Sequence, residues 1–301
     1  MTKAAGIAPL KSFRYLALLF VILFGLATIV ATGGGNGGGD SSSSTGTLSM
    51  SIADAKPLLP AGTKNVWITF EELLVHKSGG GWISLPLAQT PYTIDLYQFY
   101  YGKSTHLVPP VSLETGKYTQ MRIVISEAEI NIDDKRFPVT ISSENLKTDK
   151  NFAFTVTGGG AVDVTIDFDL SKSIVVTGLP GEPSYKLKPV LHIVKTLEAA
   201  TIIGRIDKDT FSDDDPNEAT VAVFWDKDGS RDYSQDDEGY TEVTVQEGAP
   251  ATFSIFWLVP DEGYTVKIYM DGDLDLEFEE FVKASDLGPG SIFVLNGGEP
   301  I

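Results

Sequence analysis

The chain has 301 residues and no cysteine, so disulfide bonds, thiolate catalysis and thiolate metal sites are excluded. Its formal net charge is −18 at pH 7, and the excess lies in the last third: residues 1–200 contain 17 Lys or Arg and 17 Asp or Glu, whereas residues 201–301 contain 6 and 24. No basic region offsets this surplus, which argues against nucleic acid as a partner.

Residues 1–32 are predicted to be a signal peptide or a membrane anchor. Three basic residues precede the unbroken apolar run Tyr15–Ala31, which is the order of an export signal. The run holds 17 residues, at the short limit of the roughly 17–25 that span a bilayer. We therefore expect export and association with the membrane through this segment, and cleavage or retention of the segment stays open.

The end of the apolar run resembles a bacterial lipobox, except that Thr32 stands where the lipidated Cys belongs. No thioether lipid can form at a threonine. We therefore expect a lipoprotein-like N-terminus that carries no lipid at this position. Residues 33–45 are rich in Gly and Ser, and we expect a flexible linker with no packed structure.

Residues 46–197 are predicted to form a first β-sandwich, because β-branched and aromatic residues alternate in short runs between clusters of Gly and Pro. The segment Tyr92–Tyr101 is predicted to be a short helix or an irregular aromatic plug. The expected strands are 47–53, 66–75, 82–85, 118–132, 152–156, 162–168, 174–176 and 185–194.

Residues 199–301 are predicted to form a second, acidic β-sandwich of the immunoglobulin or transthyretin type. A helical turn is expected only at Glu279–Ala284. The expected strands are 201–206, 219–225, 241–245, 251–257 and 264–270. The fold class is thus all-β, with two antiparallel β-sandwiches.

Five ordered segments of the first predicted domain resemble domain-of-unknown-function family 4382. The resemblance implies an exported, often lipid-anchored bacterial surface domain with no established activity. The segments are 46–55, 66–82, 116–122, 167–175 and 187–191.

The second predicted domain resembles carboxypeptidase regulatory-like modules. The resemblance lies in the strand Phe253–Phe256 and the following turn and strand start, Val259–Tyr264. It implies an accessory or spacer module that carries no catalysis of its own.

Acidic residues follow several predicted strands of the second domain at alternate positions. Hard divalent cations prefer several oxygen ligands at close range, which alternate side chains of a tight loop supply. We therefore predict that calcium binds in these loops, with a solvated acidic spacer as the alternative. The candidate ligands are Asp207, Asp209, Asp226, Asp228, Asp232, Asp236, Asp271, Asp273, Asp275, Glu277 and Glu279.

Strand direction predicts which acidic loops meet. In an antiparallel sandwich, successive strands end at alternate poles. Asp207 and Asp209 should then lie near Asp271–Glu279, and Asp226–Asp236 should lie at the opposite pole.

No other constellation points to catalysis or to a cofactor. The triplet Gly158–Gly160 opens no helix, which argues against a nucleotide-binding phosphate loop. Asp167 and Asp169 flank Phe168 at strand spacing and are expected on an exposed polar face.

The sequence therefore predicts a non-enzymatic exported protein of the cell envelope or cell surface, or a secreted one, with a surface polymer or protein as its partner. The alternative is a module that binds carbohydrate or another surface polymer through exposed aromatics at Tyr92–Tyr101. A hydrolase is a third hypothesis.

Overall fold

The computed structural model describes residues that all belong to the unit Ser42–Ile301. The predicted signal segment and most of the predicted linker lie outside them, so both stay predictions. Among the described residues, no helix is long and apolar enough to cross a bilayer. The described ranges are 44–54, 59–100, 102–142, 145–147, 152–179, 182–207, 210–211, 218–231, 237–246, 251–270 and 275–301.

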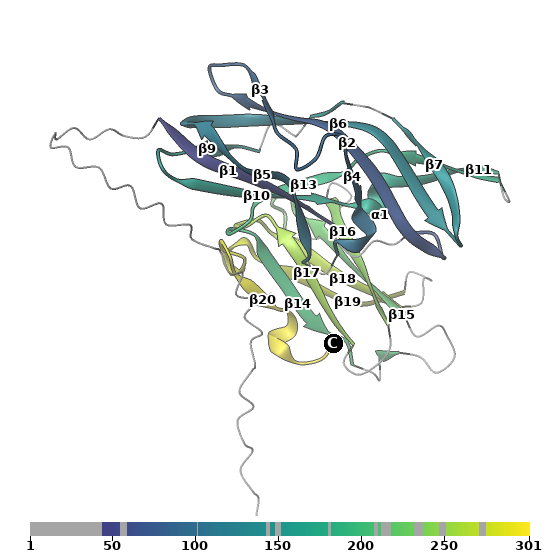
Figure 1. Cartoon of the computed structure of the whole chain (residues 1–301). Coiled ribbons are helices and arrows are strands. Elements are labelled where there is room, and N and C mark those ends of the chain that lie inside the picture. The colour runs from purple at the N-terminus through teal and green to yellow at the C-terminus, as the bar shows by residue number, and fades with distance from the viewer. Residues whose placement is uncertain are drawn as a thin grey trace, which may run out of the picture. The chain divides into compact units, whose positions relative to one another are not determined.

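The first sandwich contains a four-stranded sheet in the order β13-β10-β1-β5 (Figure 1). Its strands are β1 (Thr45–Ala53), β5 (Ser104–Glu114), β10 (Ala161–Phe168) and β13 (Leu191–Lys195). β1 pairs with β10 in parallel and with β5 in antiparallel fashion. β10 is covered on both faces, since every residue from Val164 to Phe168 is buried.

The facing sheet has nine strands and follows the path β11-β12-β7-β6-β2-β3. Its long central pair, β2 (Thr63–Lys77) and β6 (Gly116–Ile132), is antiparallel. The other strands are β3 (Trp82–Leu85), β4 (Tyr92–Asp95), β7 (Lys135–Ile141), β8 (Asn145–Lys147), β9 (Phe154–Val156), β11 (Ile174–Leu179) and β12 (Glu182–Leu187).

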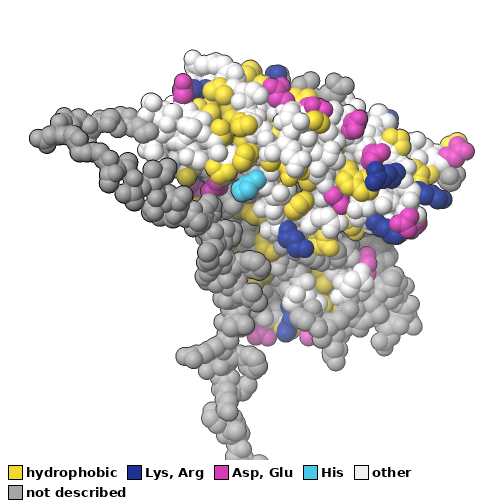
Figure 2. All heavy atoms as spheres, in the orientation of Figure 1, with side chains coloured by type: hydrophobic (Ala, Val, Ile, Leu, Met, Phe, Trp, Pro, Cys, Tyr) yellow, Lys and Arg dark blue, Asp and Glu magenta, His cyan; other side chains and the backbone are white. Residues whose placement is uncertain are grey.

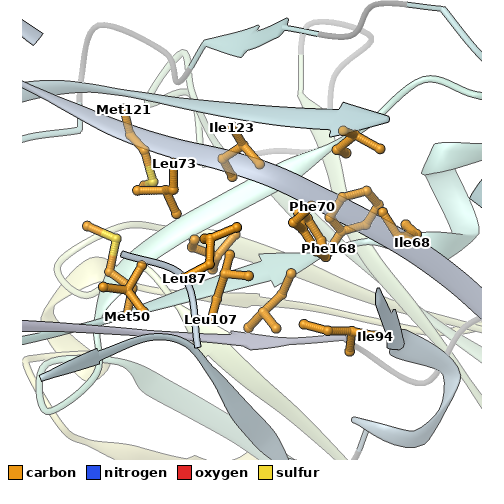
Figure 3. Close-up of a cluster of buried hydrophobic side chains, with 14 of the residues drawn as sticks. Met50, Ile68, Phe70, Leu73, Leu87, Ile94, Leu107, Met121, Ile123 and Phe168 are labelled. Atoms are coloured by element: carbon orange, nitrogen blue, oxygen red, sulfur yellow. The ribbon is translucent and has the colours of Figure 1, made fainter. Parts of the chain in front are cut away.

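The core of the first sandwich lies between these two sheets, where alternate residues of each strand point inward. Figure 3 shows Met50 of β1 and Leu107 of β5 facing side chains of β2 and β6. Members of this buried cluster include Met50, Ile68, Phe70, Leu73, Ile94, Leu107, Met121, Ile123 and Phe168. On the face shown in Figure 2, acidic and basic side chains are interspersed, as the zero net charge of residues 1–200 leads one to expect.

The second sandwich packs a three-stranded sheet, β17-β14-β20, and a four-stranded sheet, β16-β15-β18-β19. Its buried cluster is separate from the first and spans Ala200 to Leu295. The strands are β14 (Ala200–Arg205), β15 (Glu218–Trp225), β16 (Glu238–Gln246), β17 (Thr252–Leu258), β18 (Tyr264–Met270), β19 (Asp275–Val282) and β20 (Ile292–Val294).

Helices are short in the described residues. The 3-10 turn η1 (Leu96–Gln98) follows β4, so the predicted short helix within Tyr92–Tyr101 is confirmed in part. The single turn α1 (Leu170–Ser173) follows β10, and its N-cap is Asp169. The turns η3 (Ala284–Asp286) and η4 (Leu295–Gly298) lie near the C-terminus.

The predicted all-β sandwich fold is confirmed, and most strand pairs are antiparallel. Within the described ranges three pairs are parallel: β1 with β10, β12 with β7, and β14 with β20. The helical prediction for Glu279–Ala284 was wrong over most of its length, because β19 runs to Val282. The boundaries at 46–197 and 199–301 stay predictions.

Candidate functional site

The two ends of a β-hairpin bring three carboxylates together. β15 and β16 are antiparallel neighbours, and Trp225 at the end of β15 pairs with Glu238 at the start of β16. Asp226 and Asp237 are the residues next to this pair, so closure of the hairpin places them side by side. Together with Asp228 they offer carboxylate oxygens that all lie within 4.8 Å of one another.

Main-chain groups fix two of these carboxylates. The N–H of Ser230 donates to Asp228 Oδ1 at 2.8 Å, and the N–H of Arg231 donates to Asp226 Oδ2 at 3.3 Å. The turn from Asp226 to Arg231 contains Gly229 at a φ of 70°, a conformation that glycine adopts without steric cost. The turn therefore holds both carboxylates close before any ion is considered.

Asp226 is the buried member of the cluster. Only 9% of the residue is exposed, and its Oδ1 atom is buried with no hydrogen-bond partner. Burial raises the pKa of Asp226, and the carboxyl of Asp228 and the charge of Asp237 raise it further. The arrangement opposes the charged state of Asp226 unless a cation compensates it.

The spacing suits a hard divalent cation. Calcium binds oxygen ligands at about 2.3–2.6 Å, so two oxygens on opposite sides of the ion lie roughly 4.6–5.2 Å apart. Three carboxylate oxygens within 4.8 Å can therefore share one ion. They are fewer than the roughly six to eight ligands of calcium, and main-chain carbonyls or water must supply the rest.

The structure brings together only part of the predicted ligand set. Asp226 and Asp228 were predicted, whereas Asp237 was missed. Asp207 follows β14, and its main-chain N–H donates to the carbonyl of Ile301 at 3.0 Å. The remaining predicted ligands Asp209, Asp232, Asp236, Asp271 and Asp273 lie outside the described residues.

The other predicted calcium loop enters a strand. Asp275, Glu277 and Glu279 belong to β19, and the side chains of the first two are not among those described. Glu279 pairs with Lys267 at 2.9 Å, and the Lys267 side chain is 9% exposed. Glu279 thus serves as the counter-charge of a buried lysine, and the ligand role of all three stays a prediction.

The predicted separation of the acidic runs stays a prediction, because residues 232–236 and 271–274 lie outside the described residues. Trp225 pairs with Tyr264 at the start of β18, and Ala219 pairs with Met270 at its end. Asp226 therefore lies at one end of this sheet, and Met270 lies at the other.

The expectation for Asp167 and Asp169 was wrong, because both residues are only 1% exposed. Asp169 accepts a hydrogen bond from the N–H of Lys172 at 3.1 Å and caps α1. Burial raises the pKa of Asp169, and the nearby charge of Lys172 opposes that rise. Both carboxylates are buried where β10 ends and α1 begins, and they have a structural role there.

The aromatic residues at Tyr92–Tyr101 are half-buried where they are described. Tyr97 and Phe99 pack against the core of the first sandwich. Tyr97 and Tyr100 have ring centroids 6.0 Å apart, and Lys103 lies 5.6 Å from the Tyr100 ring. Tyr101 lies outside the described residues.

Comparison with known families identifies the first sandwich. A family model described as "Domain of unknown function (DUF4382)" matches residues 45–189. This part of the chain is similar to the DUF4382 domain. The DUF4382 match begins at the first residue of β1 and ends just after β12. The resemblance of the second sandwich to carboxypeptidase regulatory-like modules stays a prediction.

Similarity to solved structures is low. The Bacillus anthracis TIE protein has 14% identity and a TM-score of 0.21, and the match covers 83% of this chain and 33% of that chain, so this chain spans about a third of its length. A candidate cell adhesion protein from Bacteroides fragilis has 11% identity and a TM-score of 0.20, with 82% and 91% covered. The fimbrial anchor protein Mfa2 from Porphyromonas gingivalis has 9% identity and a TM-score of 0.19, with 81% and 84% covered. No curated protein matches the sequence.

Proposed function

We propose that this chain is a non-enzymatic, exported protein of the cell envelope or cell surface, and that its second sandwich binds calcium at Asp226, Asp228 and Asp237. The apolar N-terminal run behind basic residues supports export, and the DUF4382 resemblance implies the same location. In this proposal the N-terminal segment contacts the membrane, and the two sandwiches act outside it.

One observation carries the calcium proposal. The cluster contains a carboxylate that is nine-tenths buried, and one of its oxygens has no hydrogen-bond partner. Burying such a group is unfavourable unless an opposite charge compensates it. A divalent cation within reach of all three carboxylates provides that charge and the missing partner.

The polymer-binding alternative requires exposed aromatic rings at Tyr92–Tyr101. The described rings there are half-buried, so no observation favours this alternative over the cation site.

Thermal unfolding of the full chain with chelator or with calcium tests the proposal. A ligand that binds only the folded state adds RT ln(1 + [L]/Kd), which is about 2.7 kcal/mol when calcium is at 100 times its Kd. We expect millimolar calcium to raise the Tm of the wild type. Asp228→Asn should remove most of the rise, because it takes away one of the three carboxylate ligands. Asp228 is exposed, so this substitution leaves the buried structure unchanged.

Glu299→Gln is the matched control, because it removes one exposed negative charge of the same sandwich outside the cluster. This variant should keep the full rise in Tm. An unchanged Tm of the wild type in calcium would contradict the proposal, and so would an equal rise in Asp228→Asn.

A further inference from the structure

The first residues of β16 contact both the acidic cluster and the first sandwich. Asp237, which contributes to the cluster, directly precedes β16. A side chain built at Gly239 would lie 3.3 Å from Nζ of Lys172, which belongs to α1 of the first sandwich. The ring of Tyr240 stacks on His192 of β13 with centroids 3.9 Å apart. Three positions thus separate a candidate cation ligand from a contact between the sandwiches.

Tyr240 anchors this contact, which we call the sandwich junction (Lys172, His192, Gly239 and Tyr240). His192 Nε2 donates a hydrogen bond to the main-chain carbonyl of Tyr240 at 3.0 Å. The hydroxyl of Tyr240 donates to the carbonyl of Trp257 at 2.9 Å. Tyr240 is fully buried, so it cannot shift without disturbing both sandwiches.

The residue before Asp226 also contacts Tyr240. Trp225 immediately precedes Asp226, and its ring meets that of Tyr240 edge-on at 5.9 Å. Trp225 also donates from Nε1 to Glu262 at 3.3 Å. Asp226 therefore follows a residue that contacts Tyr240, and Asp237 precedes the strand that contains Tyr240.

The first-sandwich side of the junction is polar. Asp167 pairs with His192 across the β10–β13 ladder, and Asp169 caps the helical turn that carries Lys172. β13 is an edge strand of its sheet, and it contacts β17 of the second sandwich. Hydrogen bonds and charge contacts between buried polar groups are strong in such surroundings, so the contact is sensitive to the position of β16.

We propose that the cation at Asp226, Asp228 and Asp237 controls the stiffness of the sandwich junction. This inference rests on the proposed calcium site. Without the ion, mutual repulsion of the carboxylates pushes the ends of β15 and β16 apart and loosens the Tyr240–His192 stack. With the ion, the ends are held together and β16 stays seated on Lys172 and His192. Calcium then determines whether the two sandwiches move as one body.

Hydrogen–deuterium exchange of the full chain, with chelator or with millimolar calcium, tests this proposal. We expect calcium to slow exchange severalfold in peptides of residues 238–246 and also in residues 191–195 of the first sandwich. Asp228→Asn should remove both effects, and Glu299→Gln should keep both. Calorimetric titration of the same samples with calcium chloride measures binding separately.

A second variant separates the junction from the ion site. His192→Gln removes the ring that stacks on Tyr240 and leaves the three carboxylates in place. It should bind calcium as the wild type does and lose the slowing of exchange at 191–195. If calcium binds the wild type but leaves exchange at 191–195 unchanged, the junction proposal is overturned while the calcium site stands. If no binding is measured, the proposed function itself fails.

Discussion

The two sandwiches bury acidic residues in different ways. In the first, Asp54 accepts a hydrogen bond from the N–H of Leu170 at 3.0 Å, and Asp169 accepts one from Lys172 and lies 3.5 Å from its ammonium group. In the second, Asp226 lies among two other carboxylates, those of Asp228 and Asp237. The two regions differ in the neighbours of the buried carboxylate: N–H groups and an ammonium group lie next to the acids of the first sandwich, whereas two carboxylates lie next to Asp226, which also accepts the N–H of Arg231.

This difference indicates where an external ion matters. A buried carboxylate that accepts main-chain hydrogen bonds and has no acidic neighbour contributes to stability, because its removal leaves donors unpaired. For a buried carboxylate among like charges, such as Asp226, repulsion opposes the gain from its main-chain hydrogen bond until a cation binds. Substitution of the two kinds should therefore change the free energy of unfolding in opposite directions when calcium is absent.

Asp54→Ala should have the largest effect. Asp54 is 1% exposed, and its loss leaves the buried N–H of Leu170 without its acceptor. We expect the free energy of unfolding to fall by about 1–3 kcal/mol in urea titrations with chelator present. Asp54→Asn keeps an acceptor oxygen and should lose less. Equal losses in the two variants would show that the charge of Asp54, and not its hydrogen bond, stabilises the fold.

Asp226→Asn should have a smaller effect of the opposite sign. The amide keeps an acceptor for the N–H of Arg231 and removes one charge from the cluster. With chelator, we expect the free energy of unfolding to rise by about 0.5 kcal/mol or more, the scale of coupling between contacting groups. With calcium, the wild type should become the more stable protein. A fall in stability with chelator would place Asp226 in the same class as Asp54.

Alternation of apolar residues was enough to predict the central strands. β1, β2, β6 and β10 all alternate apolar and polar residues with the period of two that is typical of a strand, although β10 is buried on both faces. β5 was missed because Pro109 and Pro110 read as a loop, yet β5 is an edge strand, where a missing N–H is tolerated.

Two further errors concern the second sandwich. Phe278, Phe281 and Val282 have helical spacing, and their strand is irregular: the β18–β19 pairing contains a register shift. Asp237 was missed because the prediction followed ligand spacing along one loop. The cluster forms through hairpin closure, which pairs Trp225 with Glu238 and is visible only once the strand register is known.

The smallest predicted effect is a dependence of stability on pH. It tests whether Lys172 offsets the cost of burying the charge of Asp169. Burial raises the pKa of Asp169 above its usual 3.8, although Lys172 lowers it. The folded protein therefore keeps this proton at pH values where the unfolded chain has lost it, and stability falls as pH rises from about 4 through the raised pKa. Asp169→Asn retains the capping oxygen and does not titrate. In urea titrations from pH 4 to pH 7, we expect the stability of the wild type relative to this variant to decrease with rising pH, by less than the loss in Asp54→Ala. A relative stability that increases with pH would mean that Lys172 outweighs burial, and that Asp169 is as well compensated as Asp54.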